Sequence, residues 1–324
     1  MNVVGLTNYN LVIIGSIGYD VYITGGNNKI IFAPGGFAWH CASGILSVDA
    51  KATVLANITR GFNRNLLKRF KNTKINVAVN NSSDIFENAY IFDFSIPNYT
   101  SGISYSEGIP DNKFSSFLKK FAKTPQIIHV GTTNPGTILI RILDIEANVH
   151  SKVKFSSNIY LPYITKPNLP HLSQIIKKCS ILFMNYEELL RLRKFGLQSL
   201  LKNKLLFVTC GKIGTAVFKN GKLASSQLIT PKSEVSAIGA GDVFIGACLA
   251  CLVKGYDLFS SLVLANNTAS NSVTAYGTSH VKRIYSPEIL IKRAMTDQKI
   301  IFRQCTIESF RKATIFIRPK PSQV

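Results

Sequence analysis

Acidic residues are scarce in this sequence: its 324 residues include 17 Asp and Glu but 38 Lys and Arg, which gives a formal net charge of +21. Such an excess of positive charge is typical of proteins that bind nucleic acids. Here, however, the Lys and Arg residues are spread along the whole chain instead of gathering in one block. We therefore expect a solvated basic surface that attracts small anionic substrates, with no specific nucleic-acid partner.

A membrane-spanning apolar run and a secretory leader are also missing. No uninterrupted apolar segment reaches the ~20 residues needed to cross a bilayer, and the N-terminus lacks a charged stretch followed by a long apolar one. Both absences favour a cytoplasmic protein without a membrane partner. The six cysteines are scattered through apolar segments, which indicates buried thiols rather than disulfides or a zinc site.

Two common nucleotide-binding signatures are absent as well. A Walker A loop, G-x-x-x-x-G-K-[ST], occurs nowhere in the chain. The stretch from Gly239 to Gly241 fails as a dinucleotide fingerprint, because Phe244 stands where the third glycine of G-x-G-x-x-G should be. The chain is therefore predicted to be neither a P-loop protein nor a protein with the usual dinucleotide fingerprint.

What the chain has instead is a glycine-rich turn, 236–242, that leads into an apolar helical pattern ending at Gly255. Such a turn aims the free N–H groups and the positive dipole end of a helix at one point, which suits a phosphate. Asp242 in the first helical turn would repel that phosphate and therefore needs a reason. Accepting the proton of a hydroxyl that attacks the phosphorus is the simplest one. The alternative is an ordinary strand–turn–helix corner with a dipole-stabilising aspartate.

This turn resembles the second signature of the PfkB (ribokinase-like) family of sugar and nucleoside kinases, Asp-Thr-x-Gly-Ala-Gly-Asp-x-Phe. Ser236 and Ala237 replace its leading Asp-Thr. The resemblance implies that Asp242 is the catalytic base and that backbone N–H groups of the turn stabilise the transferred phosphoryl group. The residues that match the signature are Gly239, Ala240, Gly241, Asp242 and Phe244.

A second block, from Pro34 to Gly44, resembles the first signature of the same family. Its paired glycines open a helical pattern of small residues, and His40 stands where the family commonly has Asn. An apolar strand at 11–14 precedes it, followed by a loop with Asp20. The resemblance implies that these segments and the loop after strand 127–130 hold the hydroxyl acceptor. The expected acceptor-binding residues are Asp20, Gly35, Gly36, His40 and Thr133.

Each of these residues has an alternative interpretation from the sequence alone. Asp20 is equally compatible with an ordinary turn aspartate. His40 is equally compatible with a structural histidine. Trp39, the only tryptophan, could stack on the acceptor or fill the core.

A small β-lid is expected from segments 20–34 and 85–100. Residues 21–24 and 29–32 alternate around a Gly/Asn turn, which predicts a hairpin, and 88–95 predicts a further strand. The resemblance implies that this lid covers the acceptor. Its apolar and aromatic content would also suit the interface of a homodimer.

A third set of motifs concerns ATP and magnesium. Asn185 and Glu188 match the Asn-x-x-Glu motif that organises Mg²⁺ in the family, largely through water; a helix cap without chemistry is the alternative. A Val-Thr-x-Gly-x-x-Gly motif and an Asn on a later helical pattern would flank the nucleotide. The expected ATP-binding residues are Asn185, Thr209, Gly211, Gly214 and Asn266.

Short apolar strands alternate with helical patterns, and the motif residues fall at the carboxyl ends of the strands. This predicts a doubly wound, mostly parallel α/β sheet flanked by helices. Strands are expected at 52–58, 127–130, 153–155 (before a polar loop at 156–158), 181–184 and 205–208, and helices from 240 and 257. A kinase domain at 1–285 would be followed by a basic C-terminal extension at 286–324 with one helix and a loose tail.

The expected function is a carbohydrate kinase that uses ATP and Mg²⁺. A nucleoside kinase of the same fold is one alternative. A non-catalytic binding protein is another, because His40, Ser236, Ala237 and the missing Asp after Gly61 depart from the family pattern. K⁺ activation is doubtful, since Ser236 replaces the carboxylate that helps form the family's monovalent-cation site.

Overall fold

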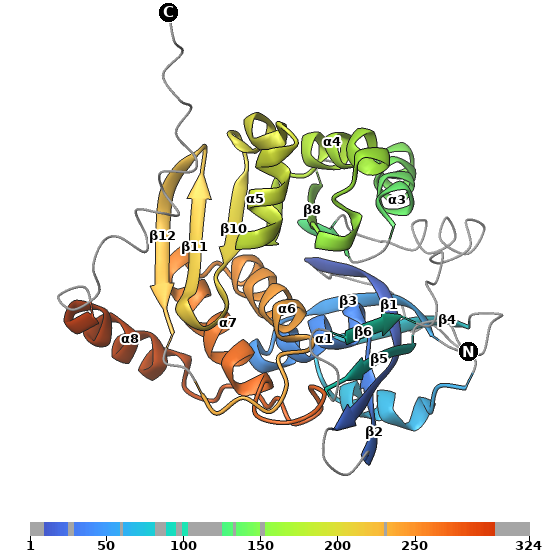
Figure 1. Ribbon diagram of the computed structural model, residues 1–324. Helices are drawn as coiled ribbons and strands as arrows, with labels where there is room; N and C mark the ends of the chain where they lie inside the picture. The colour runs from blue at the N-terminus through green and yellow to red at the C-terminus, as the bar shows by residue number, and fades with distance from the viewer. Residues whose placement is uncertain are drawn as a thin grey trace, which may run out of the picture.

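The structure, a computed structural model, describes residues 10–24, 29–58, 61–81, 89–94, 99–102, 125–131, 134–149, 153–229 and 232–301. Its centre is a sheet in the order β12-β11-β10-β9-β8-β7-β1-β3-β4 (Figure 1). All neighbouring strands from β4 to β10 are parallel, and β11 and β12 form an antiparallel edge. The strands of this sheet are β1 (Leu11–Thr24), β3 (Ala52–Ile58), β4 (Ile75–Asn81), β7 (Ile127–Val130), β8 (Lys154–Asn158), β9 (Ile181–Asn185), β10 (Leu205–Thr209), β11 (Gly214–Lys219) and β12 (Lys222–Leu228).

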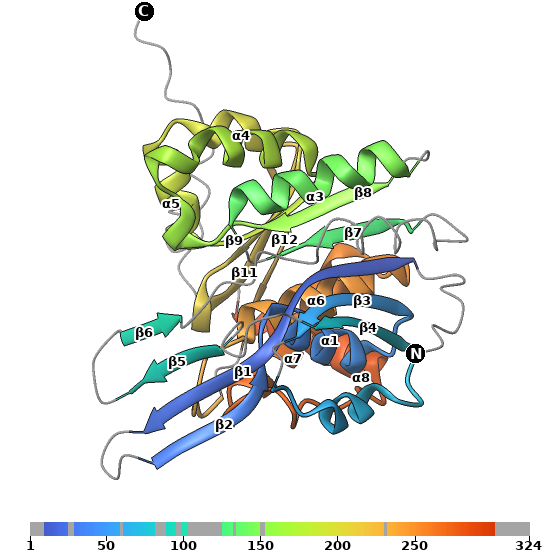
Figure 2. The ribbon, with the colours of Figure 1, turned by 90° about the vertical axis from the view of Figure 1, so that its right-hand side faces the viewer.

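Helices cover both faces of the sheet, which explains why its inner strands are continuous apolar runs. Figure 2 shows α3, α4 and α5 on one side of the sheet and α1, α6 and α7 on the other. Neighbouring residues of β1 supply both cores, because Ile13 packs with the α1–α6–α7 side and Val12 with the α3–α4–α5 side. The helices are α1 (Phe37–Val48), α3 (Pro135–Asn148), α4 (Leu169–Lys178), α5 (Tyr186–Lys194), α6 (Ala240–Val253), α7 (Leu258–Ser272) and α8 (Pro287–Ile301), with short 3₁₀ turns η1 (Arg64–Phe70), η2 (Leu161–Tyr163), η3 (Lys166–Asn168), η4 (Leu197–Leu201) and η5 (Gly211–Ile213).

Strand β1 corrects one expectation from the sequence. It does not end at Gly15 but runs for 14 residues, so Asp20 lies inside a strand and not in a loop. Its first half pairs in parallel with β3, and from Gly18 onward it pairs antiparallel with β2 (Lys29–Gly35). The alternation that was expected to start a new strand at Val21 instead continues the first one out of the core, and this extension forms the base of the lid.

The expected lid is present where the structure describes it. Strand β5 (Ala89–Asp93) lies parallel to the outer half of β1, and β6 (Tyr99–Gly102) pairs antiparallel with β5. The hairpin turn at 25–28 and the segments 85–88 and 95–98 lie outside the described residues.

Three further expectations are refined. Ser156 and Ser157 belong to buried strand β8 and not to a polar loop, because their hydroxyls bond to His129 and to the Val130 carbonyl. The helical pattern that begins at Asp257 predicts a helix that stops at Gly277, whereas α7 ends at Ser272. The expected C-terminal helix is α8; residues 302–324, including Cys305, lie outside the described part.

Cys41, Cys179, Cys210, Cys248 and Cys251 are free thiols. Among the described helices, none combines the length and apolar character needed to pass through a bilayer.

Candidate active site

Two helices, α1 and α6, form the centre of the site, and glycines let them pack closely. A Cβ atom on Gly44 would collide with the backbone carbonyl of Val243, and one on Gly246 would collide with that of Cys41. The Cys41 thiol also donates to the carbonyl oxygen of Asp242 at 3.2 Å. Glycines in both helices thus permit the close approach, which brings the first turns of α1 and α6 together.

The glycine turn before α6 has the geometry of an anion site. Gly239 has φ 76°, a left-handed conformation that favours glycine. The Ala240 N–H donates to the Ala237 carbonyl at 3.2 Å, whereas the N–H groups of Gly241 and Asp242 precede the first hydrogen bond of the helix. A Cβ atom at Gly241 would meet no atom of the described residues within 4 Å. The turn therefore presents free donors and the positive helix end to an open space.

Asp242 stands at this helix end and lines the cleft in front of it. Protein surrounds its carboxyl group on most sides, and this burial raises its pKa to about 7. The charge of His40 lowers the pKa, whereas the charge of Asp20 raises it. A carboxyl group with a pKa near the working pH is well suited to accept a proton.

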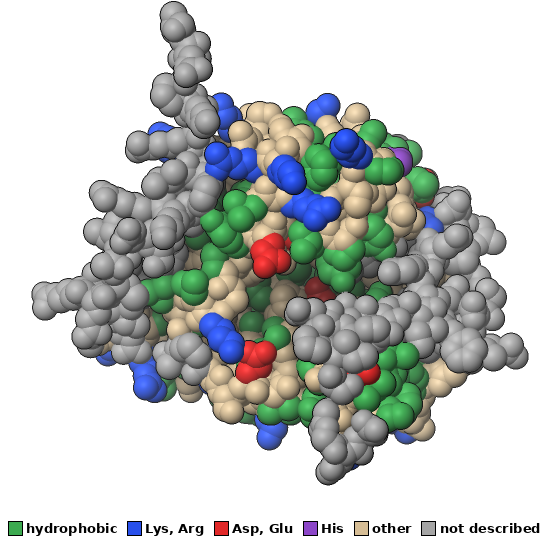
Figure 3. Space-filling view, viewed as in Figure 1, with side chains coloured by type: hydrophobic (Ala, Val, Ile, Leu, Met, Phe, Trp, Pro, Cys, Tyr) green, Lys and Arg blue, Asp and Glu red, His purple; other side chains and the backbone are tan. Residues whose placement is uncertain are grey.

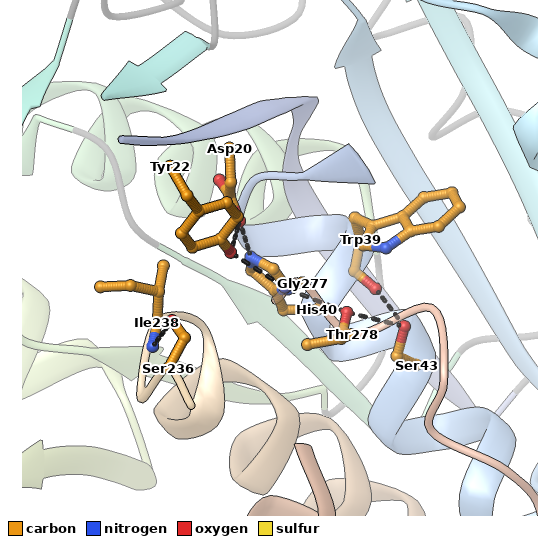
Figure 4. Close-up of polar contacts among 9 residues, drawn as sticks. All are labelled: Asp20, Tyr22, Trp39, His40, Ser43, Ser236, Ile238, Gly277 and Thr278. Carbon is orange, nitrogen blue, oxygen red and sulfur yellow. Dashed lines mark hydrogen bonds and ion pairs between the residues drawn. The ribbon is translucent and has the colours of Figure 1, made fainter. Parts of the chain in front are cut away.

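Asp20 and His40 are joined directly, as Figure 4 shows. His40 Nε2 lies 2.9 Å from Asp20 Oδ2, and the Tyr22 hydroxyl donates to the same oxygen at 3.3 Å. Both members of the pair are buried. Gly35 permits this arrangement, because any Cβ atom there would collide with the Asp20 carboxyl group. Gly36 follows with φ 85° as the N-cap of α1.

A cleft of about 610 Å³ connects these groups (Figure 3, the hollow at the centre of the face). The lid, the loop after β8 and the start of α6 all contribute to its wall. Its charged lining residues among the described ones are Asp20, Glu188, Asp242 and His40, and its aromatic ones are Phe37, Tyr90, Phe92, Tyr160, Tyr163, Phe183 and Phe244.

Asn185 and Glu188 form the helix cap that the sequence left as an alternative. The Asn185 side chain accepts the Glu188 N–H at 2.8 Å, and Glu188 Oε2 accepts the Asn185 N–H at 2.6 Å. Glu188 Oε1 accepts the Leu161 N–H at 3.1 Å. Burial raises the pKa of Glu188 to about 7, although these two N–H groups lower it.

A capping role does not remove these residues from the cleft, since both line it. Among the described residues, no group of three or more His, Cys, Asp or Glu side chains could enclose a metal ion. One amide and one carboxylate, from Asn185 and Glu188, fit Mg²⁺, which takes few carboxylates and retains water. Because both Glu188 oxygens already accept N–H groups, contact through water fits better than a direct bond.

Of the expected ATP-binding residues, Asn185 and Thr209 line the cleft, whereas Gly214 and Asn266 contact the edge strands of the sheet. Thr209 ends β10 and lines the cleft together with Asn185. Gly211 has φ 55°, and a Cβ atom added there would have no atom of the described residues within 4 Å. Gly214, however, is required by the sheet, because a Cβ atom there would collide with the Gln227 carbonyl.

Asn266 is placed away from the described lining of the cleft. Its Oδ1 accepts the Thr215 hydroxyl at 2.9 Å, and its amide donates to the Gln227 side chain at 2.5 Å. The side chain thereby connects α7 to the edge strands β11 and β12.

The sequence makes Thr133 and Trp39 candidates for contact with the hydroxyl acceptor. Thr133 lies outside the described residues. Trp39 fills the core and does not stack on a ligand: it is 1% exposed and packs edge-on against Phe70 at 5.1 Å between ring centroids.

The sequence missed several residues of the site. Tyr22 and Thr278 contact the Asp20–His40 pair, and Tyr160 and Tyr163 line the cleft. Tyr22 follows Asp20 by two residues on a strand, so its inward direction was readable from the alternation. Thr278 carries no local signal, because it reaches the site only through the fold.

The fold and site together define a class. A mostly parallel sheet with a strand-built lid, and a carboxylate at a helix N-terminus beneath it, is the arrangement of a ribokinase-like phosphotransferase. The model of the family described as "pfkB family carbohydrate kinase" matches residues 110–283, more than half of the chain. The chain belongs to the PfkB family.

A relative resembles part of this chain. The chain is 31% identical over 137 residues to a Mycoplasma genitalium protein described as "Putative 1-phosphofructokinase". That match spans 42% of either chain, less than half of the relative's length.

The two solved structures show the same fold over nearly the whole chain. A nucleoside kinase of Methanocaldococcus jannaschii is 20% identical with a TM-score of 0.67, covering 89% of this chain and 99% of its own. An E. coli structure described as "a putative Ribokinase II in complex with ATP and Mg+2" is 17% identical with a TM-score of 0.68, covering 88% and 100%.

Proposed function

We propose that this protein transfers the γ-phosphoryl group of ATP to a hydroxyl of a sugar or sugar-like molecule. The observation that carries the proposal is the position of Asp242, a carboxyl group with a pKa of about 7 at the N-terminus of α6, in the same cleft as Asp20. Asp20 accepts a hydrogen bond from the acceptor and orients it. Asp242 removes the proton of the attacking hydroxyl as its oxygen bonds to the γ-phosphorus and ADP leaves.

The backbone of the turn and the Asn185–Glu188 pair serve the nucleotide. The N–H groups of Gly241 and Asp242 stabilise negative charge on the transferred phosphoryl group. Asn185 and Glu188 would hold Mg²⁺ through water, and the bound ion would supply positive charge that offsets the charge of the phosphates. Thr209 and Gly211 are the further proposed ATP-binding residues, whereas Gly214 and Asn266 are proposed to support the ATP site through the edge strands β11 and β12. The E. coli structure with ATP and Mg²⁺ supports this choice of co-substrate and metal.

The lining of the cleft bears on the acceptor. Its described charged residues are three carboxylates and one histidine, which favours an uncharged acceptor over a sugar phosphate. A nucleoside is the second candidate, because Tyr90, Phe92 and Tyr160 could stack on a base. The similar fold of a nucleoside kinase supports including this class.

The lid also supports a proposed homodimer. Strand β2 exposes Ile30 and Phe32, which are 55% and 68% accessible. A second copy could cover these side chains. We place the protein in the cytoplasm, where ATP is available.

The test is a direct assay of the purified protein. ADP release is measured with ATP, Mg²⁺ and panels of sugars and nucleosides chosen by thermal shift. We expect Asp242→Asn to lower kcat ~10²–10⁴-fold while ATP binding is retained, because a general base is removed. Retention of more than about a tenth of the wild-type kcat would contradict the base role. Failure of every acceptor, with ATP still bound, would favour a non-catalytic binding protein.

A further inference from the structure

His40 is buried among polar groups whose donor and acceptor roles can be worked out. Its Nδ1 atom lies 3.0 Å from the Thr278 hydroxyl, which donates to the Ser43 hydroxyl at 3.2 Å. Ser43 in turn donates to the Trp39 carbonyl at 3.1 Å (Figure 4). A carbonyl can only accept, so every proton of this chain points away from His40. The Thr278 oxygen therefore accepts from the ring, and Nδ1 carries a proton.

The opposite nitrogen faces a second chain with a fixed direction. The Gly277 N–H donates to the Tyr22 hydroxyl at 3.2 Å, and an N–H can only donate. The Tyr22 hydroxyl in turn donates a hydrogen bond to Asp20 Oδ2. This is the same atom that lies 2.9 Å from His40 Nε2. Asp20 Oδ2 accepts the hydrogen bond of Tyr22 and also faces the His40 ring, so we treat this oxygen as an acceptor for both. Nε2 consequently also donates.

The ring lies directly against the phosphate turn. A Cβ atom on Gly239 would come within 2.7 Å of three carbon atoms of the His40 ring, so the ring packs on that glycine. Gly239 immediately precedes α6 and its free N–H groups. Because the His40 ring is buried, water screens its charge only weakly. A positive charge on the ring would therefore act on the anion site and on Asp242.

We propose that His40 is a doubly protonated imidazolium that acts as a positioning residue for both halves of the site. It holds the Asp20 side chain in its orientation toward the acceptor through the 2.9 Å contact, and it places a buried positive charge behind Gly239. Both ring nitrogens are in use, so His40 acts on the acceptor through Asp20. The charge state of His40 is independent of the proposed kinase activity, whereas its effect on phosphoryl transfer rests on that activity.

The groups that face His40 agree with a charged ring. Asp20 from β1 and Asp242 from α6 are the acidic groups, and their charges raise the pKa of His40 although burial alone would lower it. Burial raises the pKa of Tyr22 and of Cys41, so neither competes for the proton near neutral pH. Among the described lining residues of the cleft, His40 alone can offset the three carboxylates.

The first experiment reads the proton directly. The imidazole nitrogens of ¹⁵N-labelled full-length protein are followed by NMR from pH 5.5 to 8.5, and the His40 signal is identified by its loss in His40→Asn. We expect both nitrogens to remain protonated at pH 7.5, where an ordinary histidine with a pKa of about 6.5 is mostly neutral. A neutral tautomer at pH 7.5 would overturn the proposal, whatever the activity of the protein.

The second experiment compares the same change, threonine to valine, at two buried positions. Thr278→Val removes the acceptor of the Nδ1 proton. Thr53→Val is the control, because the buried Thr53 hydroxyl has no hydrogen-bond partner among the residues that the structure describes. We expect Thr278→Val to move the His40 titration to lower pH and to raise the acceptor KM ~2- to 10-fold, the effect of one hydrogen bond. Thr53→Val should match the wild type in both. An unchanged His40 titration in Thr278→Val would contradict the proposed chain.

The third measurement separates charge from packing. In His40→Asn, the limb of the kcat profile that reports ionisation of Asp242 should move to higher pH, because His40 lowers the pKa of Asp242 and Asp20 raises it. A purely structural role would lower activity without moving this limb, and that result would overturn the electrostatic role. If the protein has no kinase activity but His40 is an imidazolium, the proposed function fails and the charge assignment stands.

Discussion

Asp242 and Glu188 show how single residues exchange stability for function. Burial is the main cause that raises both pKa values to about 7. A carboxyl group whose pKa is raised by folding stabilises the protein while it is protonated. That contribution is complete below the unfolded pKa of about 4 and is lost as the pH rises through about 7. Near neutral pH the ionised site therefore destabilises the fold.

The first consequence concerns Asp242→Asn. The substitution removes the ionisation but nearly preserves the shape, so the variant should gain stability over the wild type as the pH rises. We expect its Tm advantage to be larger at pH 8 than at pH 5 by at least ~2 °C. Thermal unfolding at the two pH values measures this. An equal Tm difference at both would mean that Asp242 ionises normally in the folded state.

Glu188→Gln tests whether the helix cap also serves the metal. Each Glu188 oxygen accepts a backbone N–H, and a glutamine amide nitrogen cannot. At pH 5, where the raised pKa keeps folded Glu188 mostly protonated and the removed charge contributes little, we expect a loss of about 1–2 kcal/mol in the free energy of unfolding, typical of a lost cap. We also expect more Mg²⁺ to be needed for half-maximal activity. Both are measured by denaturant unfolding and by a Mg²⁺ titration.

The control for this variant lies one residue away. Glu187 is in the same first turn of α5 but is exposed, so Glu187→Gln removes the same charge without touching the cleft. It should leave the Mg²⁺ titration unchanged. If Glu188→Gln lowers stability but also leaves the titration unchanged, Glu188 is a cap alone.

At the scale of elements, the site depends on how closely α1 and α6 pack. Gly246→Ala puts a methyl group into the Cys41 backbone, which can yield only if the two helices move apart. We expect a loss of ~1–3 kcal/mol of stability, the usual cost of overpacking. We also expect a higher KM and a lower kcat, since His40 would shift against Gly239. Unfolding and kinetics of the variant provide the measurement.

Gly61→Ala is the matched substitution in this case. In the described part of the chain, a Cβ atom at Gly61 would meet nothing within 4 Å, and the residue lies outside the described lining of the cleft. It should change stability by less than ~1 kcal/mol and leave the kinetics alone. Equal behaviour of the two variants would show that helix spacing does not position the site.

The elements differ in how far the sequence predicted them. Buried parallel strands such as β3 and β9 are plain apolar runs, and glycine turns mark α1 and α6, so these were predictable. The glycines of β1 resembled a strand end, whereas lid pairing on both sides carries the strand through them. Residues within a motif were found together. Thr278, which contacts His40, and Tyr160, which lines the cleft, reach the site only through tertiary contacts that no local pattern encodes.

At the scale of the whole molecule, positive charge governs what the site can attract. The chain carries a formal net charge of +21, which favours anions such as ATP and disfavours cations. At the glycine turn itself, the Ser236 hydroxyl accepts the Ile238 N–H at 3.3 Å, so it braces the turn instead of standing free for an ion. With Ala237 beside it, this segment offers a cation no carboxylate.

We therefore expect activity to be nearly independent of K⁺ once ionic strength is held constant. An ion held by neutral oxygens alone, close to a ring that we assign a positive charge, would bind weakly. The measurement exchanges K⁺ for tetramethylammonium at fixed Mg²⁺, ATP and acceptor and follows ADP release. Because screening of a basic surface weakens ATP attraction with any salt, only a saturable response specific to K⁺ is informative. A several-fold activation of that kind would mean that other oxygens rebuild the cation site, and that the charge near Gly239 is lower than the His40 network implies.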